Sequence, residues 1–177
     1  MGFEKLKAET VYSGRAFSVE KVEMRLPDEK IRSYDLVRHN GSVTIVPLDS
    51  QGNLLFVSQY RIGLEQELLE LPAGVMEDSE EPAQSAEREV REETGMAAGN
   101  LELLGDYYLA PGYSSERTYA YLATGLYPNP LAQDEDEFLQ LRAIPVKEAY
   151  RLALDGAIQD SKSLAALLLA RPRLGGE

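Results

Sequence analysis

GVMEDSEEPAQSAEREVREETGM, residues Gly74–Met96, crowds glutamates onto one predicted helix. Residues 80–93 contain six glutamates and two arginines. Glu89 and Glu93 are four residues apart, so they share a helix face, with Glu92 beside them. Like charges at this spacing repel, and carboxylates in the last turn face the negative end of the helix dipole. A hard divalent cation, Mg²⁺ or Mn²⁺, takes oxygen ligands and would offset this repulsion.

The glutamates alone leave a plainer alternative open, because most charge runs are solvated helix faces. The flanking residues add to the signal. Leu71-Pro72-Ala73 precedes Gly74, and Gly95 is placed to end the helix as a C-terminal glycine.

The whole stretch fits the pattern G-x5-E-x7-R-E-U-x-E-E-x-G-U, in which U is a large apolar residue. Its positions are filled by Gly74, Glu80, Arg88, Glu89, Val90, Glu92, Glu93, Gly95 and Met96. This pattern resembles the signature of the Nudix hydrolases. The resemblance implies an α/β fold, an α/β/α sandwich on a mixed β-sheet, and hydrolysis of pyrophosphate bonds.

Composition limits the other classes of function. The chain has 177 residues, 44% of them hydrophobic, which suits one domain with a small extra element. It contains no apolar run of membrane-spanning length and no apolar signal segment, and its lack of cysteine excludes thiolate chemistry. These features favour a cytoplasmic protein.

A net charge of −12 argues against nucleic acid or an anionic membrane as the partner. A phosphorylated small molecule remains compatible, because a bound metal ion inverts the local charge. The single histidine, His39, lies in a predicted turn, so a Ser–His–Asp mechanism has little to use. The chemistry must therefore rely on carboxylates and metal.

Residues 1–40 are predicted as an antiparallel β element that makes substrate or dimer contacts, and residues 41–177 as the hydrolase domain. Within the latter, strands 42–48 and 53–60 are expected to form a hairpin around the turn at 49–52. Ser79 is the expected N-cap of a helix over 80–94. The other expected elements are strands at 67–71, 101–109, 118–124 and 138–144 and helices at 146–154 and 161–171.

The Nudix resemblance assigns roles to the acidic residues of the motif. Glu89 and Glu93 are the first choice as metal ligands, Glu92 is the third and also a catalytic candidate, and the carbonyl of Ala73 joins them. The expected cofactor is Mg²⁺ or Mn²⁺. Arg88 is expected to orient a glutamate through a bidentate ion pair.

Two further segments resemble the ADP-ribose pyrophosphatase subgroup. Alone, Ala110–Arg117 (APGYSSER) is an ordinary turn, but Pro111 follows Gly95 by 16 residues, as in that subgroup. The resemblance places Glu116 near the terminal ribose. It also assigns the catalytic base to the acidic run 134–137, where Glu137 is favoured and Glu135 stays open.

The remaining predicted substrate contacts are cationic or aromatic. Arg61 matches an arginine that grips phosphate in the subgroup. Arg32 and Tyr34 are expected to contact the nucleotide, either across a homodimer interface or within their own subunit. Tyr12 and Tyr113 are other candidates for stacking on the base.

The favoured function is metal-dependent hydrolysis of ADP-ribose to AMP and ribose 5-phosphate by water attack. Two alternatives stay open. One is the same chemistry on GDP-mannose or another nucleoside diphosphate sugar, and the other is a non-catalytic nucleotide sensor with this fold. The expected partner is a small nucleoside diphosphate sugar.

Overall fold

The computed structural model describes residues 2–133 and 138–175. The strands in these residues are β1 (Glu4–Ser13), β2 (Ser18–Arg25), β3 (Ile31–Arg38), β4 (Ser42–Pro47), β5 (Asn53–Arg61), β6 (Gln66–Glu70), β7 (Ala73–Val75), β8 (Met96–Ala97), β9 (Asn100–Tyr108), β10 (Arg117–Thr124), β11 (Tyr127–Pro128) and β12 (Gln140–Pro145). The helices are α1 (Pro82–Thr94), α2 (Val146–Leu154), α3 (Ser161–Ala170) and the short 3-10 helix η1 (Arg171–Arg173). None of these helices is long and apolar enough to cross a membrane.

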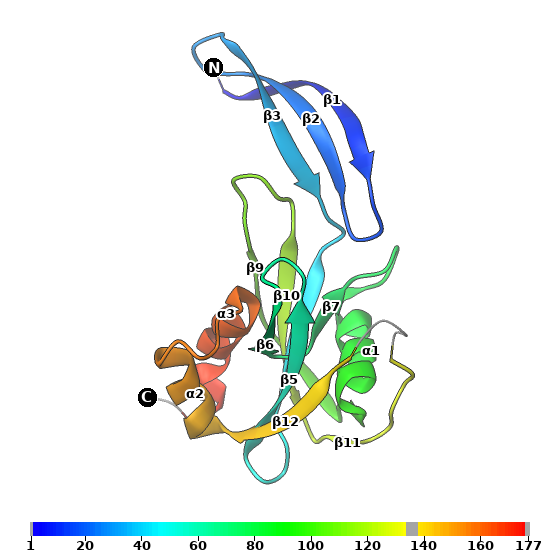
Figure 1. The fold of residues 1–177 in the computed structure, drawn as a ribbon, viewed down its shortest axis with the longest axis vertical. Coiled ribbons are helices and arrows are strands. Elements are labelled where there is room, and N and C mark those ends of the chain that lie inside the picture. Colours follow the sequence, from blue (N-terminus) through cyan, green and yellow to red (C-terminus); the bar gives the residue numbers. More distant parts are fainter. Residues whose placement is uncertain (1, 134–137, 176–177) are drawn as a thin grey trace. The chain divides into compact units, whose positions relative to one another are not determined.

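Strand β4 is the centre of the larger of two compact units, which comprises residues 42–107 and 118–175. All six residues of β4 are buried, as expected for an apolar strand covered on both faces. It pairs parallel with β10 and antiparallel with β7, in a sheet of order β7-β4-β10-β9. Helix α1 lies on one side of this sheet, and α2 and α3 lie on the other (Figure 1). The predicted α/β/α sandwich on a mixed sheet is therefore confirmed.

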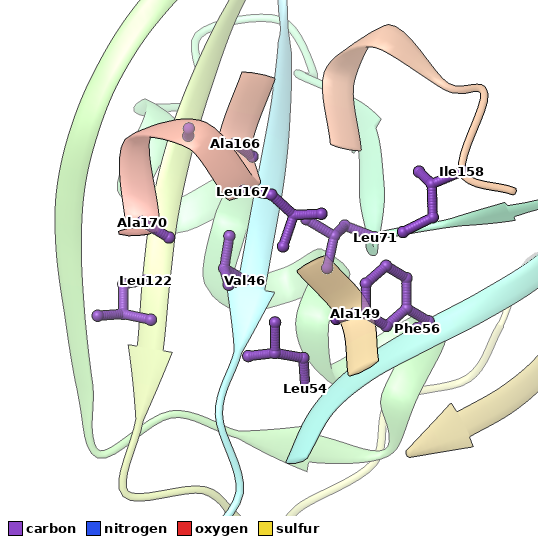
Figure 2. Packing of buried hydrophobic residues seen from close by; sticks show 11 residues of the cluster. Val46, Leu54, Phe56, Leu71, Leu122, Ala149, Ile158, Ala166, Leu167 and Ala170 are labelled. Atoms are coloured by element: carbon purple, nitrogen blue, oxygen red, sulfur yellow. The ribbon is translucent and has the colours of Figure 1, made fainter. Parts of the chain in front are cut away.

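The side chains of β4 divide between two cores, because successive residues of a strand point to opposite faces. Val43 and Ile45 pack with Ala86 and Val90 of α1. Val46 belongs to the larger core beneath α2 and α3. Figure 2 shows this core, in which the fully buried Phe56 lies close to Leu71.

The prediction that β4 and β5 pair as a hairpin is wrong, although the turn between them forms. Asp49 does form a tight turn. Its N–H donates to the carbonyl of Asn53, its carbonyl accepts from the N–H of Gly52, and its side chain accepts from the N–H of Asn53. The two strands then part after a single bridge between Leu48 and Leu54. Both edges of β4 are occupied by β7 and β10, so β5 instead pairs with β6 and β12 in a separate antiparallel sheet.

Helix α1 begins two residues later than predicted. Glu81, not Ser79, is the N-cap, and it forms a capping box with Gln84, with Pro82 in the first turn. Ser79 has a φ of 67° and lies in the preceding loop. The predicted C-terminal glycine is confirmed, since Gly95 is left-handed with a φ of 73° and its N–H donates to the carbonyl of Arg91.

The smaller unit comprises residues 2–41 and 108–117. Its strands form an antiparallel sheet of order β1-β2-β3, as the sequence predicts. Only Val22 among its hydrophobic side chains is buried, whereas Val11, Tyr12 and Ile31 are more than half exposed. The loop 110–116 joins the end of β3, because Val37 exchanges backbone hydrogen bonds with Tyr113 and Ser115.

Candidate active site

Arg88 lies at the centre of a carboxylate cluster on α1. Its Nε and Nη2 bind the two oxygens of Glu80 at 3.1 and 3.0 Å, and its Nη1 binds Glu89 at 2.7 Å and Glu92 at 2.9 Å. These contacts confirm the predicted bidentate ion pair and place it on Glu80. The hydrogen bonds lower the pKa of Glu80 below its ordinary value, although burial acts in the opposite direction.

Glu89 and Glu93 are buried, with 7% and 3% of their surface exposed. The plain alternative of a solvated acidic face therefore does not hold for these two residues. Arg88, however, supplies the cation that the repulsion argument demanded for Glu89. Part of the negative charge of the cluster is therefore balanced within the chain.

Gly74 provides the space in which the carboxylate of Glu89 lies. A Cβ atom at this position would come within 1.8 to 2.4 Å of the Glu89 carboxylate atoms. The neighbouring residue Ala73 donates its N–H to Oε2 of Glu93 at 3.2 Å. The structure thus brings Ala73, Glu89, Glu92 and Glu93 to the junction between β7 and α1.

This junction fits a divalent cation by the chemistry of its donors. They are carboxylate and carbonyl oxygens, which Mg²⁺ and Mn²⁺ prefer. The single positive charge of Arg88 does not balance the negative charges of four neighbouring carboxylates, those of Glu80, Glu89, Glu92 and Glu93. An excess of negative charge therefore remains. Among the residues that the structure describes, no three acidic or histidine side chains converge as a ready-made metal site, and Arg88 occupies oxygens of Glu89 and Glu92.

A pocket of about 470 Å³ opens beside the C-terminal end of α1. Its lining includes Glu92 and Glu93 together with Pro130, Leu131 and Leu141. A larger groove of about 600 Å³ lies along α2 and α3. Its lining contains no carboxylate among residues 2–133 and 138–175, so it is not a candidate for this chemistry.

Arg61 ends β5 and is held by Glu70 of β6. Its Nε and Nη2 bind the two Glu70 oxygens at 2.7 and 2.6 Å, and Glu70 is only 1% exposed. These hydrogen bonds raise the pKa of Arg61 against the effect of burial, and the charges of Asp160 and Glu93 add to the shift. The predicted phosphate-binding arginine is therefore engaged in a bidentate pair within electrostatic range of Glu93.

The other predicted contacts lie in the smaller unit. Arg32 and Tyr34 are two residues apart on β3 and so share a face of that strand. Tyr34 is 47% exposed, and Arg32 donates to the carbonyl of Ile31 at 3.1 Å. The N–H of Glu116 donates to Ser114 Oγ at 3.1 Å. The predicted catalytic residues Glu135 and Glu137 lie outside the described residues.

Comparison with known proteins matches residues 38–167 to the NUDIX domain. The chain belongs to the Nudix family. This Nudix protein is 38% identical to an ADP-ribose pyrophosphatase of Mycobacterium tuberculosis, over 94% of this chain and 82% of that protein. It is 34% identical to a methanol dehydrogenase activator of Bacillus methanolicus, over 92% and 89% of the two chains.

A crystal structure of an ADP compounds hydrolase has the same fold. It superposes with a TM-score of 0.88 at 30% identity, covering 99% of this chain and 95% of the other. The expected Nudix fold is thereby confirmed. The protein is a Nudix pyrophosphohydrolase, an enzyme that hydrolyses phosphoanhydride bonds.

Sequence reasoning missed Glu70 and the residues that hold it. Glu70 interrupts the apolar run Leu68–Leu71, in which the pattern predicts only a strand. A buried carboxylate normally has a cationic partner, so a glutamate in such a run was the available signal. Asp160 likewise caps α3 by accepting from Ser163 N, and the segment Asp160-Ser161-Lys162-Ser163 has the composition of a helix start.

Replacing Gly74 by alanine tests the placement of Glu89. Because the new Cβ would meet a side-chain end that can move, Gly74→Ala should fold normally while Glu89 shifts. We expect turnover to fall by about 100-fold, the cost of misplacing a catalytic group by about 1 Å. Gly63→Ala is the control, since a Cβ there meets nothing within 4 Å. Equal turnover of the two variants would show that the Glu89 position does not limit activity.

Replacing Arg88 by methionine tests the charge balance. The variant should lose about 3 kcal/mol of unfolding free energy at pH 7, because partly buried carboxylates lose their partner. Arg88 lowers the pKa of Glu80, so this stabilisation is complete above the ordinary glutamate pKa and disappears as pH falls through the lowered value. The difference in unfolding free energy between the wild type and Arg88→Met should therefore become smaller below about pH 4.

Arg91→Met is the matched control for that measurement. Arg91 lies on the same helix and binds the carbonyl and side chain of Asn129, and no acid among the described residues pairs with it. Urea denaturation across the pH range should show a loss of about 1 kcal/mol or less for this variant, with little dependence on pH. If the loss of unfolding free energy in Arg88→Met did not change with pH, the assigned ion pairs would be contradicted.

Proposed function

We propose that this Nudix protein hydrolyses ADP-ribose to AMP and ribose 5-phosphate, using Mg²⁺ or Mn²⁺. The main support is the burial of Glu89 and Glu93 together against Ala73 and Gly74 within a complete Nudix motif. The substrate is supported by the named activity of a relative that aligns with 94% of this chain.

The residues that would hold the cation are Glu89, Glu92, Glu93 and the carbonyl of Ala73. A divalent cation bound there neutralises phosphate oxygens and lowers the pKa of a bound water. Arg88 keeps Glu89 and Glu92 in place through its ion pairs. The Ala73 N–H orients Glu93 through a hydrogen bond to its carboxylate.

Arg61 would bind the diphosphate. Its Nε and one hydrogen of Nη2 are used by Glu70, so three of the five guanidinium hydrogens remain available to phosphate oxygens. The bidentate pair also fixes the plane of the group, which lowers the entropy lost when substrate binds. Arg32, Tyr34 and Glu116 are proposed as further contacts with the nucleotide and the terminal ribose.

Water attack on one phosphorus breaks the phosphoanhydride bond, and the proton of the water goes to a carboxylate base. Glu137 is the proposed base, and Glu135 is the alternative.

The first test measures release of phosphate in the presence of a phosphatase, with and without Mg²⁺. ADP-ribose, GDP-mannose, a UDP-sugar, NADH and a dNTP form the panel. We expect Mg²⁺-dependent turnover that is fastest on ADP-ribose. A faster rate on another nucleoside diphosphate sugar would make that compound the substrate in place of ADP-ribose. Binding without turnover of any compound would favour a nucleotide sensor.

Glu93→Gln tests the role of the buried carboxylates. Glutamine keeps an oxygen that can accept from Ala73 N–H but removes the charge, so we expect turnover to fall by about 100-fold or more with the fold intact. Glu87→Gln is the control, because Glu87 is on the same helix and exposed. The ligand assignment of Glu93 fails if both variants retain wild-type rates.

We also propose that the enzyme is a homodimer, assembled through the sheet β1-β2-β3. The exposed side chains of Val11, Tyr12 and Ile31 leave this small sheet without a core of its own, and isolated sheets of this kind need packing for stability. Light scattering after size-exclusion chromatography should give twice the mass of the chain. A monomer at assay concentrations would contradict this proposal.

A further inference from the structure

The first turn of α3 holds the segment that leads into Gly74. Ser163 Oγ accepts a hydrogen bond from the Leu71 N–H at 2.7 Å, across 92 residues of sequence. Both residues are fully buried. Figure 2 shows the Leu71 side chain beside Leu167 of the same helix, so polar and apolar contacts fix this residue together.

Asp160 determines the direction of the Ser163 hydroxyl. Its Oδ2 accepts from Ser163 Oγ at 2.7 Å and from Ser163 N at 2.8 Å. Burial acts to raise the pKa of Asp160, but the charge of Lys162 and the hydrogen bonds from Lys162 and Ser163 outweigh it and lower the pKa. An ionised carboxylate only accepts. The hydroxyl must therefore donate to Asp160 and turn its lone pair toward Leu71.

Lys162 extends the same network to the neighbouring residue. Its Nζ binds Asp160 at 2.6 Å and reaches Glu70 at 3.4 Å, and Glu70 holds Arg61. Two consecutive residues, Glu70 and Leu71, are thus contacted by one helix turn. Buried networks in which every partner is satisfied are rigid.

The segment after Leu71 is short and stiff. Pro72 has a fixed φ, and its carbonyl accepts from Ile45 N of β4 at 2.8 Å. Ala73 follows and donates to Glu93. A displacement of Leu71 therefore passes to Ala73 with little room for the chain to absorb it.

We propose that Ser163 is a positioning residue for the Ala73–Glu93 pair, acting through the Leu71 amide and oriented by Asp160. The catalytic consequence of this inference rests on the proposed function, in which Ala73 and Glu93 hold the metal. The structural consequence, a fixed Ala73 amide, stands on the geometry alone.

The test compares Ser163→Ala with Tyr150→Phe. Tyr150 donates to the Leu167 carbonyl at 2.8 Å, so its variant also removes a hydrogen bond to α3 but leaves Leu71 untouched. Amide hydrogen exchange is measured at Ala73, two residues from the deleted bond, and at Val46 of β4 as a reference. We expect exchange at Ala73 to quicken about tenfold relative to Val46 in Ser163→Ala only, the size of effect typical of one buried hydrogen bond.

Steady-state kinetics on the fastest substrate supply the second measurement. Ser163→Ala should lower kcat about tenfold with KM within about twofold, because transition-state contacts are displaced while substrate binding persists. Tyr150→Phe should leave both constants unchanged. Unchanged Ala73 exchange, or faster exchange with wild-type kcat, would overturn the proposal.

Ser163→Cys provides a second variant in case the alanine variant does not fold. It nearly preserves side-chain volume, but a thiol is a weak acceptor. We therefore expect smaller changes in the same direction, both in the exchange rate of Ala73 and in kcat. If the wild-type enzyme turns over no substrate, the proposed function fails. The exchange rate of Ala73 in the serine variants then decides the positioning role by itself.

Discussion

The guanidinium of Arg88 lies between the carboxylates of Glu80, Glu89 and Glu92, which would otherwise repel one another on a partly buried surface. Because one cation serves three anions, the end of the loop and the face of α1 are held in a single geometry. The ion pairs also leave an excess of negative charge, so the site remains attractive to a further cation. The same ion pairs therefore fix the geometry of the cluster and leave its net charge negative.

Local signals in the sequence predicted α1 well. The C-terminal glycine, Gly95, acts within a few residues and marks the end of the helix, whereas the start lies two residues beyond the predicted one because Glu81 is the N-cap. Strand pairing was harder. A tight turn at Asp49 normally joins a hairpin, but the edges of β4 are taken by β7 and β10, and only the assembled sheet reveals that competition. The bounds of β1 have no clear sequence signal, because all its residues are exposed and apolar alternation is weak.

The candidate site shows the same division. Glu89, Glu92, Glu93 and Ala73 were predicted from a compact motif, and the structure gathers them at one junction. The partners of Arg61 and Leu71 were not predicted, because Glu70 reads as part of a strand and Ser163 is 92 residues from Leu71. A hydrogen bond between residues so far apart in the chain leaves no local pattern in the sequence. It appears only when α3 packs on the core.

The separation between Leu71 and Ser163 also affects how the enzyme is made. During synthesis the Nudix motif leaves the ribosome well before α3, and the bond that holds its entry segment has no acceptor until then. Contacts this distant in sequence form late and slow folding. In the nascent chain, the acidic residues of the motif are therefore in place before the contact that fixes Leu71 can form.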